Sequence, residues 1–159
     1  MSQGLATRYP LVLVPGMLGF IRLVLYPYWY GIAEALRRGG AVVFAVQVSP
    51  LHSNEVRGEQ LLAQIEEILR ETGAEKVNLI GHSQGSLTAR YAAAKRPDRV
   101  ASVTSVAGPN HGSELADYLH KHYPADSAKG RLLAFLLRVI GALMSLLETG
   151  YRGPKLPVD

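Results

Sequence analysis

The sequence predicts an α/β protein with a mostly parallel sheet and flanking helices, and three observations lead to this fold class. Short apolar runs alternate with segments of helical periodicity over the first 125 residues. The runs are rich in Val, Leu and Ile with little polar alternation, which is typical of strands buried on both faces. The helical segments stop at glycine or just ahead of proline. Strands that alternate with helices in this way form a parallel sheet with right-handed crossovers.

The expected strands and helices follow one another in a regular order. The strand-like runs are Pro10–Val14, Ala41–Val48, Val77–Ile80 and Val100–Val106. The helical patterns between them are Tyr30–Arg38, Val56–Thr72 and Gln84–Lys95. Reactive groups gather at the carboxyl ends of parallel strands, so the loops that follow the strands are the candidate site loops. These loops are Pro15–Gly19, Ser49–Asn54, Gly81–Gly85 and the stretch AGPNHGSE after Val106.

Composition excludes several classes of protein. Hydrophobic residues make up 48% and charged residues 19% of the 159 residues, which is globular and sufficient for one domain. The formal net charge is +4, but Lys and Arg are spread along the chain, so nucleic-acid binding is weakly supported. The chain has no cysteine, which excludes disulfides, cysteine metal ligands and a thiol nucleophile. The first residues lack the order of a signal peptide, and the localisation is left open.

The most informative turn is Gly81-His82-Ser83-Gln84-Gly85, between an apolar run and a helical pattern. The glycines allow the strand and the helix to approach closely, and the turn lifts the serine hydroxyl to the top of the sheet. The pattern predicts that Ser83 is a catalytic nucleophile, and the alternative is an N-cap serine in an ordinary turn. A serine nucleophile needs donors for the oxyanion that forms on attack. The candidates are the N–H groups of Gln84 and of Met17, which lies in the loop after the first strand.

Four stretches carry a resemblance to a known family: YPLVLVPGMLGF, YPYWYGIAEALRRGGAVVFAVQVSPLHSNEVRGEQLL, KVNLIGHSQGSLTARY and ASVTSVAGPNHGSELAD. They resemble the bacterial triacylglycerol lipases of the Pseudomonas/Burkholderia/Proteus type, which have an α/β-hydrolase fold. The resemblance covers essentially the whole chain but only about the N-terminal half of that family. It implies the same roles for Ser83, Met17 and Gln84, and it implies that Arg57 braces the oxyanion loop. It also implies a secreted protein.

One departure from the family pattern lies in the loop after the first strand. The family usually has His-Gly where this chain has Pro15-Gly16. Proline removes a side-chain hydrogen bond and one N–H, whereas the N–H needed for catalysis belongs to Met17. The oxyanion site is therefore expected to survive in a stiffer loop whose bracing differs.

No histidine of the sequence is a convincing general base. His82 is expected to point away from Ser83 and to pack, and His52 is expected to be solvated on a loop. His111 is the only local candidate for a base, but in α/β-hydrolases the acid and then the histidine follow the serine on later strands. His120 and His122 are expected near a helix end. A metal site built from His111, His120 and His122 fits no common zinc spacing.

The acid of a triad is missing as well. No strand-like run follows Val106, so no later acid is expected at a strand end; these acids are Asp98, Glu114, Asp117, Asp126, Glu148 and Asp159. The resemblance implies that the family's Asp, His and calcium ligands lie beyond this chain's end. No cofactor or metal is expected within the chain, and calcium is possible in the complete family-type protein. A second polypeptide segment is one possible source of the Asp and the His.

The stretch DSAKGRLLAFLLRVIGALMSLLETG predicts an amphipathic helix over residues 127–148. A polar stripe of Arg131, Arg138 and Ser145 stands opposite a face rich in leucine, and the apolar run is too short to span a bilayer. One interpretation is a core helix of the domain. The other, which the resemblance favours, is a mobile lid that shields an apolar acyl pocket and opens on a lipid surface.

These features predict three parts of the chain and a function. Residues 1–125 would form the nucleophile-bearing part of an incomplete α/β-hydrolase core, residues 126–149 the lid-type helix, and residues 150–159 a loop leading out of the chain. The predicted function is hydrolysis of lipid esters at a lipid–water interface through an acyl-Ser83 intermediate. The alternative is a non-catalytic, hydrolase-like fragment that binds lipid or a partner through its apolar helix.

Overall fold

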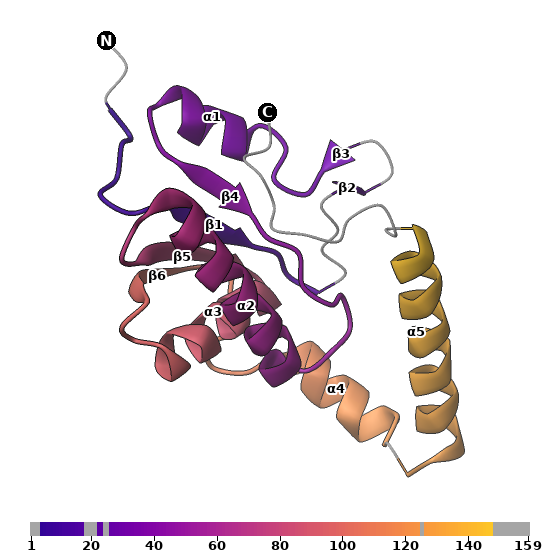
Figure 1. Ribbon diagram of the computed structural model, residues 1–159. Coiled ribbons are helices and arrows are strands. Elements are labelled where there is room, and N and C mark those ends of the chain that lie inside the picture. The colour runs from indigo at the N-terminus through magenta and orange to yellow at the C-terminus, as the bar shows by residue number, and fades with distance from the viewer. Residues whose placement is uncertain (1–3, 18–21, 24–25, 125, 148–159) are drawn as a thin grey trace. The chain divides into compact units, whose positions relative to one another are not determined.

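A computed structural model of the chain describes residues 4–17, 22–23, 26–124 and 126–147. Within these ranges, four parallel strands form a sheet in the order β4-β1-β5-β6 (Figure 1). The strands are β1 (Leu11–Val14), β4 (Val43–Ala45), β5 (Val77–His82) and β6 (Val100–Val106). All four predicted strands are therefore present, although β4 occupies only the middle of its apolar run. Between β1 and β4 in the sequence, the chain also forms a two-stranded antiparallel pair that the apolar pattern did not predict. Its strands are β2 (Arg22–Leu23) and β3 (Tyr26–Pro27).

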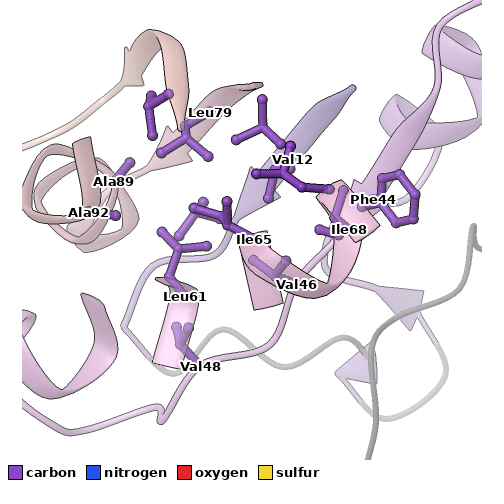
Figure 2. Close-up of a cluster of buried hydrophobic side chains, with 14 residues drawn as sticks. Val12, Phe44, Val46, Val48, Leu61, Ile65, Ile68, Leu79, Ala89 and Ala92 are labelled. Carbon is purple, nitrogen blue, oxygen red and sulfur yellow. The ribbon is translucent and has the colours of Figure 1, made fainter. Parts of the chain in front are cut away.

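Helices cover both faces of this sheet. They are α1 (Ile32–Arg38), α2 (Asn54–Thr72) and α3 (Gln84–Lys95). Successive residues of a strand point to opposite faces, so Leu11 and Leu13 pack toward α1 while Val12 and Val14 pack toward α2 and α3. Figure 2 shows the second of these clusters, in which Leu61 and Ile65 from α2 meet the valines of the sheet. Burial on both faces explains why β1 and β4 have no polar alternation.

The strand order reverses at β1. After β1 the chain continues to β4 on one side, and it then returns to β5 on the other side of β1. The loops that follow β1 and β5 therefore leave the sheet at the point where the strand order reverses. In open α/β sheets this switch point, at the carboxyl ends of the strands, is where ligands bind.

β6 differs from the prediction that each apolar run would be buried on both faces. Val100 is buried, but most of the following side chains, from Ala101 to Val106, are exposed. β6 is an edge strand, paired only with β5 along the described residues. Its middle is also rich in Ala, Ser and Thr, which bury little apolar surface. The prediction was wrong for β6, because the valines of a run do not specify where the strand lies in the sheet.

The chain divides into two compact units, of which the second begins at Pro109. The second unit contains α4 (Glu114–His122) and α5 (Ala128–Leu147). Ser113 caps α4 through its side chain, and Ser127 accepts a hydrogen bond from the N–H of Gly130 in the first turn of α5. The predicted amphipathic segment is thus helical nearly from end to end. The expected outgoing loop, residues 150–159, lies outside the described residues.

Among the described helices, none combines the length and the hydropathy that a membrane span requires.

Candidate active site

Ser83 stands at the apex of a strand–turn–helix elbow between β5 and α3. Its backbone angles are φ 53° and ψ −129°, a region that residues with a Cβ rarely occupy. Its N–H donates to the carbonyl oxygen of Val106 at 2.9 Å, and its own carbonyl accepts the N–H of Ser86 at 3.0 Å. Such strain costs about 1–3 kcal/mol and is stored mainly at functional sites.

Two other serines show what an ordinary capping serine looks like in this protein. Ser53 and Ser113 precede α2 and α4, have φ values of −62° and −146°, and accept a backbone N–H on the side chain. Ser83 also precedes a helix, but its side chain makes no capping hydrogen bond. The interpretation of Ser83 as an ordinary N-cap therefore conflicts with its geometry.

Close packing maintains this elbow. A Cβ built on Gly81 would lie 2.5 Å from the carbonyl oxygen of Gly85, and one built on Gly85 would lie 2.6 Å from that of Pro15. Both positions accept only glycine, because the obstructing atoms belong to the backbone. The fully buried Ser86 donates its hydroxyl to the carbonyl of Gly81 at 2.7 Å, which fastens α3 to the end of β5.

The loop after β1 lies against the elbow. A Cβ built on Gly16 would approach the Cβ of Ser83 to 2.9 Å and the carbonyl oxygen of His82 to 3.0 Å. The next residue, Met17, is 56% exposed. Gln84 is the first residue of α3, so its N–H is one of the helix-terminal donors that have no partner within the helix. The backbone positions predicted as oxyanion donors thus belong to the two loops that meet at Ser83.

Arg57 braces the loop after β1, as the resemblance implied. Its guanidinium is fully buried and donates to the carbonyl oxygens of Pro15 at 2.6 Å, Gly16 at 3.2 Å and Ser49 at 2.6 Å, and to the hydroxyl of Thr88 at 3.1 Å. Burial lowers the pKa of Arg57 to about 10, and the nearby Tyr28 opposes this shift. The side chain is therefore charged at neutral pH, and each of its hydrogen bonds to a carbonyl is charge-assisted.

A second contact to this loop comes from Tyr28, which precedes α1. Its hydroxyl accepts the N–H of Gly16 at 3.1 Å and is hydrogen-bonded to Nδ1 of His82 at 2.5 Å. The rings of Tyr28, Trp29 and His82 also pack together, with centroid separations of 5.2–6.3 Å. Tyr28 was not among the residues predicted to belong to the site. The only signal was its position in the stretch YPYWYG, since nothing local indicates which backbone group a tyrosine will meet.

The five histidines fall in different places. His82 is engaged with Tyr28, in agreement with the packing role expected for it, and the carbonyl of His52 accepts a weak 3.4 Å hydrogen bond from the side chain of Gln84. Among the described residues, no hydrogen bond joins a histidine ring to the hydroxyl of Ser83. His111, His120 and His122 belong to the second unit, where the ring of His122 stacks on Tyr118 at 4.2 Å.

Metal-binding side chains are scattered in the described part of the chain. No group of three or more His, Asp or Glu residues there is arranged to hold a metal ion. The grouping of His111, His120 and His122 considered from the sequence is not formed.

Comparison with known proteins identifies the family. A family model described as the alpha/beta hydrolase fold matches residues 9–158. The chain is 48% identical over 157 residues to a triacylglycerol lipase of Pseudomonas fragi and 49% identical over 152 residues to one of Vibrio cholerae. These matches cover 99% and 96% of this chain but 53% and 49% of the relatives. The chain therefore spans about half the length of the curated relatives it matches.

Solved structures agree with this match. The mature form of the Bacillus licheniformis lipase BlEst2 superposes with a TM-score of 0.62 at 25% sequence identity, over 74% of this chain and 49% of that one. The parallel sheet, the strained serine elbow after β5 and the family match all agree. This chain belongs to the alpha/beta hydrolase family.

Proposed function

We propose that this chain carries the nucleophile and the oxyanion site of a carboxylic ester hydrolase that acts on lipid esters. The observation that carries the proposal is the backbone of Ser83, which is held at a positive φ without capping the helix that follows. Similarity to triacylglycerol lipases of Pseudomonas fragi and Vibrio cholerae supports the choice of substrate class.

The proposed chemistry is an acyl transfer through Ser83. The hydroxyl oxygen of Ser83 attacks the ester carbonyl carbon, and its proton passes to a general base. The carbonyl oxygen becomes an oxyanion, which accepts hydrogen bonds from the N–H groups of Met17 and Gln84. The intermediate collapses with loss of the alcohol, which takes up the proton, and leaves an acyl-Ser83 ester. Water then attacks this ester, so that the acid is released and Ser83 regains its proton.

The base and its acid are proposed to come from outside the described residues. Relatives about twice as long as this chain offer room for both in a continuation of the same polypeptide. A separate second polypeptide, considered from the sequence, receives no support from the comparisons. Any calcium ion of the longer proteins would likewise be held by residues outside the described part, and no step above depends on one.

We also propose that α5 is the lid-type element. Its exposed apolar residues Leu132, Phe135, Leu136 and Val139 recur at the spacing of one helical face. A helix with such a face can lie on a lipid surface or cover an apolar pocket in water. The competing proposal, a non-catalytic module that binds lipid or a partner, relies on this same face.

A fluorophosphonate probe and a chromogenic short-chain ester separate the two proposals. Both are applied to the 159-residue chain and to a protein in which the chain continues past Asp159, which is called the full-length protein below. We expect the full-length protein to be labelled at Ser83 and the short chain to react slowly, because loss of triad members removes a factor of about 10⁴–10⁶. Ser83→Ala should abolish labelling, while the capping serine variant Ser53→Ala should not.

An unlabelled full-length protein with no esterase activity would reject the hydrolase in favour of the binding module. Rapid labelling of the short chain would show that a base lies within it, and His111→Ala would then be the next variant.

A further inference from the structure

The peptide group between Pro15 and Gly16 is held at both of its ends. Its carbonyl oxygen accepts from the guanidinium of Arg57 at 2.6 Å, and its N–H donates to the hydroxyl of Tyr28 at 3.1 Å. A trans peptide is planar, with its C=O and N–H on opposite sides. Two partners on opposite sides therefore fix the plane of this peptide. With a single partner the peptide plane could still rotate.

Among the described residues, the next peptide is held on one side only. The carbonyl of Gly16 accepts from Arg57 at 3.2 Å, which directs the N–H of Met17 away from that guanidinium. Gly16 itself has the widest choice of backbone angles of any residue type. The direction of the Met17 N–H consequently depends on how firmly the preceding peptide is fixed.

Gly16 is buried, so its N–H needs a hydrogen-bond acceptor. Pro15 has no N–H and no polar side chain, so it can supply no hydrogen bond to the loop except through its carbonyl. The hydroxyl that takes the Gly16 N–H comes from Tyr28, 12 residues along the chain. That hydroxyl is bonded in turn to His82, the residue just before Ser83.

We propose that Tyr28 is a positioning residue. Together with His82, it fixes the position of the oxyanion donor, the N–H of Met17, relative to the nucleophile Ser83. Arg57 holds the carbonyl side of the loop, Tyr28 holds its N–H side, and His82 ties both to the nucleophile elbow. Tyr28 touches no reacting atom in this role. This inference rests on the proposed function, because it assigns a purpose to the alignment of Met17 with Ser83.

The test uses the full-length protein and the variant Tyr28→Phe, which keeps the ring and removes only the hydroxyl. Two readouts are needed: turnover of a soluble short-chain ester, and hydrogen exchange of the Gly16 amide followed by NMR. We expect kcat to fall about 10-fold with KM within twofold, because a misplaced oxyanion donor weakens binding of the transition state alone. Exchange of the Gly16 amide should become about 3- to 10-fold faster once its acceptor is lost.

The matched control is Tyr91→Phe. The hydroxyl of Tyr91 donates one hydrogen bond to Glu59 at 2.7 Å on the protein surface, away from the loop after β1. This variant loses the same atom and one hydrogen bond, so kcat and Gly16 exchange should both match the wild type.

A double-mutant cycle tests the link to the elbow. His82→Phe keeps an aromatic ring beside Tyr28 and Trp29 but removes the hydrogen-bonding nitrogens. If Tyr28 and His82 act together through their shared hydrogen bond, kcat of the double variant should be only slightly lower than that of the less active single variant. His82→Phe also serves as the test if Tyr28→Phe does not fold, and it should then lower kcat with KM retained.

Four results would overturn the inference: unchanged kcat in Tyr28→Phe, equal Gly16 exchange in variant and wild type, strictly additive losses in the cycle, or a change confined to KM. Failure of the proposed function looks different, because the wild type itself would then show no turnover and no labelling of Ser83. The exchange measurement would still report whether Tyr28 holds Gly16.

Discussion

In the unit that ends at Gly108, leucines such as Leu61 and Leu79 are completely buried, whereas in the unit that begins at Pro109, Leu132 and Leu136 are 59% and 47% exposed. Both sets recur at helical or strand spacing, and both come from segments that are apolar on one side. The difference lies in what each unit can place against that side.

α2 has a sheet to pack on, whereas among the described residues of its own unit α5 has only α4. Leu61, Ile65 and Ile68 of α2 meet the valines of β1 and β5 in one continuous core. α4 and α5 form a groove of about 720 Å³, lined among others by Leu119, Tyr123 and Leu133, while other apolar residues of α5 are exposed. Periodicity therefore specifies which side chains share a face, and it leaves open what covers that face.

Truncation of one leucine in each unit tests this difference in burial most directly. Leu61→Ala should lower the free energy of unfolding by about 3 kcal/mol, since it removes buried methyl groups and leaves a cavity. Leu136→Ala should change it by less than about 0.5 kcal/mol, because its side chain is half exposed already. Urea denaturation measures both values. Equal losses would mean that α5 is as well covered as α2.

The second prediction concerns Arg57, which is a fully buried charged side chain of the first unit; the described residues of the second unit include no such side chain. Arg57→Met keeps much of the volume but leaves the carbonyls of Pro15, Gly16 and Ser49 without their donor. We expect a loss of about 2 kcal/mol in unfolding free energy and a larger fall in kcat than in Tyr28→Phe. Arg38→Met, at a largely exposed position, is the control and should stay within about 0.5 kcal/mol. Full activity in Arg57→Met would contradict the role of Arg57 in holding the loop after β1.

A third variant addresses the exposed face of α5 directly. Leu132→Glu combined with Leu136→Glu should leave the melting temperature nearly unchanged but reduce activity on emulsified triacylglycerol about 10-fold, with soluble esters unaffected. Ile32→Glu with Val56→Glu adds two charges at exposed apolar positions in the first turns of α1 and α2, where acidic residues are tolerated, and is the control. Unfolding of the α5 variant would instead identify this face as core.

The smallest expected effect lies on the surface of the first unit. A two-pronged hydrogen bond from Arg96 lowers the pKa of Asp98 from 3.8 to about 2. A lowered carboxyl pKa contributes stability above the unfolded value, and the contribution disappears as the pH falls through about 2. The melting temperature of the wild type should exceed that of Asp98→Asn by a small, constant margin above pH 5. The margin should close between about pH 4 and pH 2. A difference in melting temperature that grows as the pH falls would contradict the predicted direction of the pH dependence.

The sequence by itself determined the parallel architecture, the succession of the four sheet strands with the helices between them, and the elbow around Ser83. Each of these follows from local physics: unbroken Val and Leu runs suit strands covered on both faces, and glycines at Gly81 and Gly85 are needed where backbones nearly touch. Among the described residues, the tertiary structure alone decided that β6 is an exposed edge strand, because burial depends on neighbouring elements that a run of valine and serine does not specify. It alone also brought Tyr28 to Gly16 and His82, across 12 and 54 residues of chain. Hydrogen bonds of that span have no signature in spacing or composition, since they exist only once the sheet has set the two loops side by side.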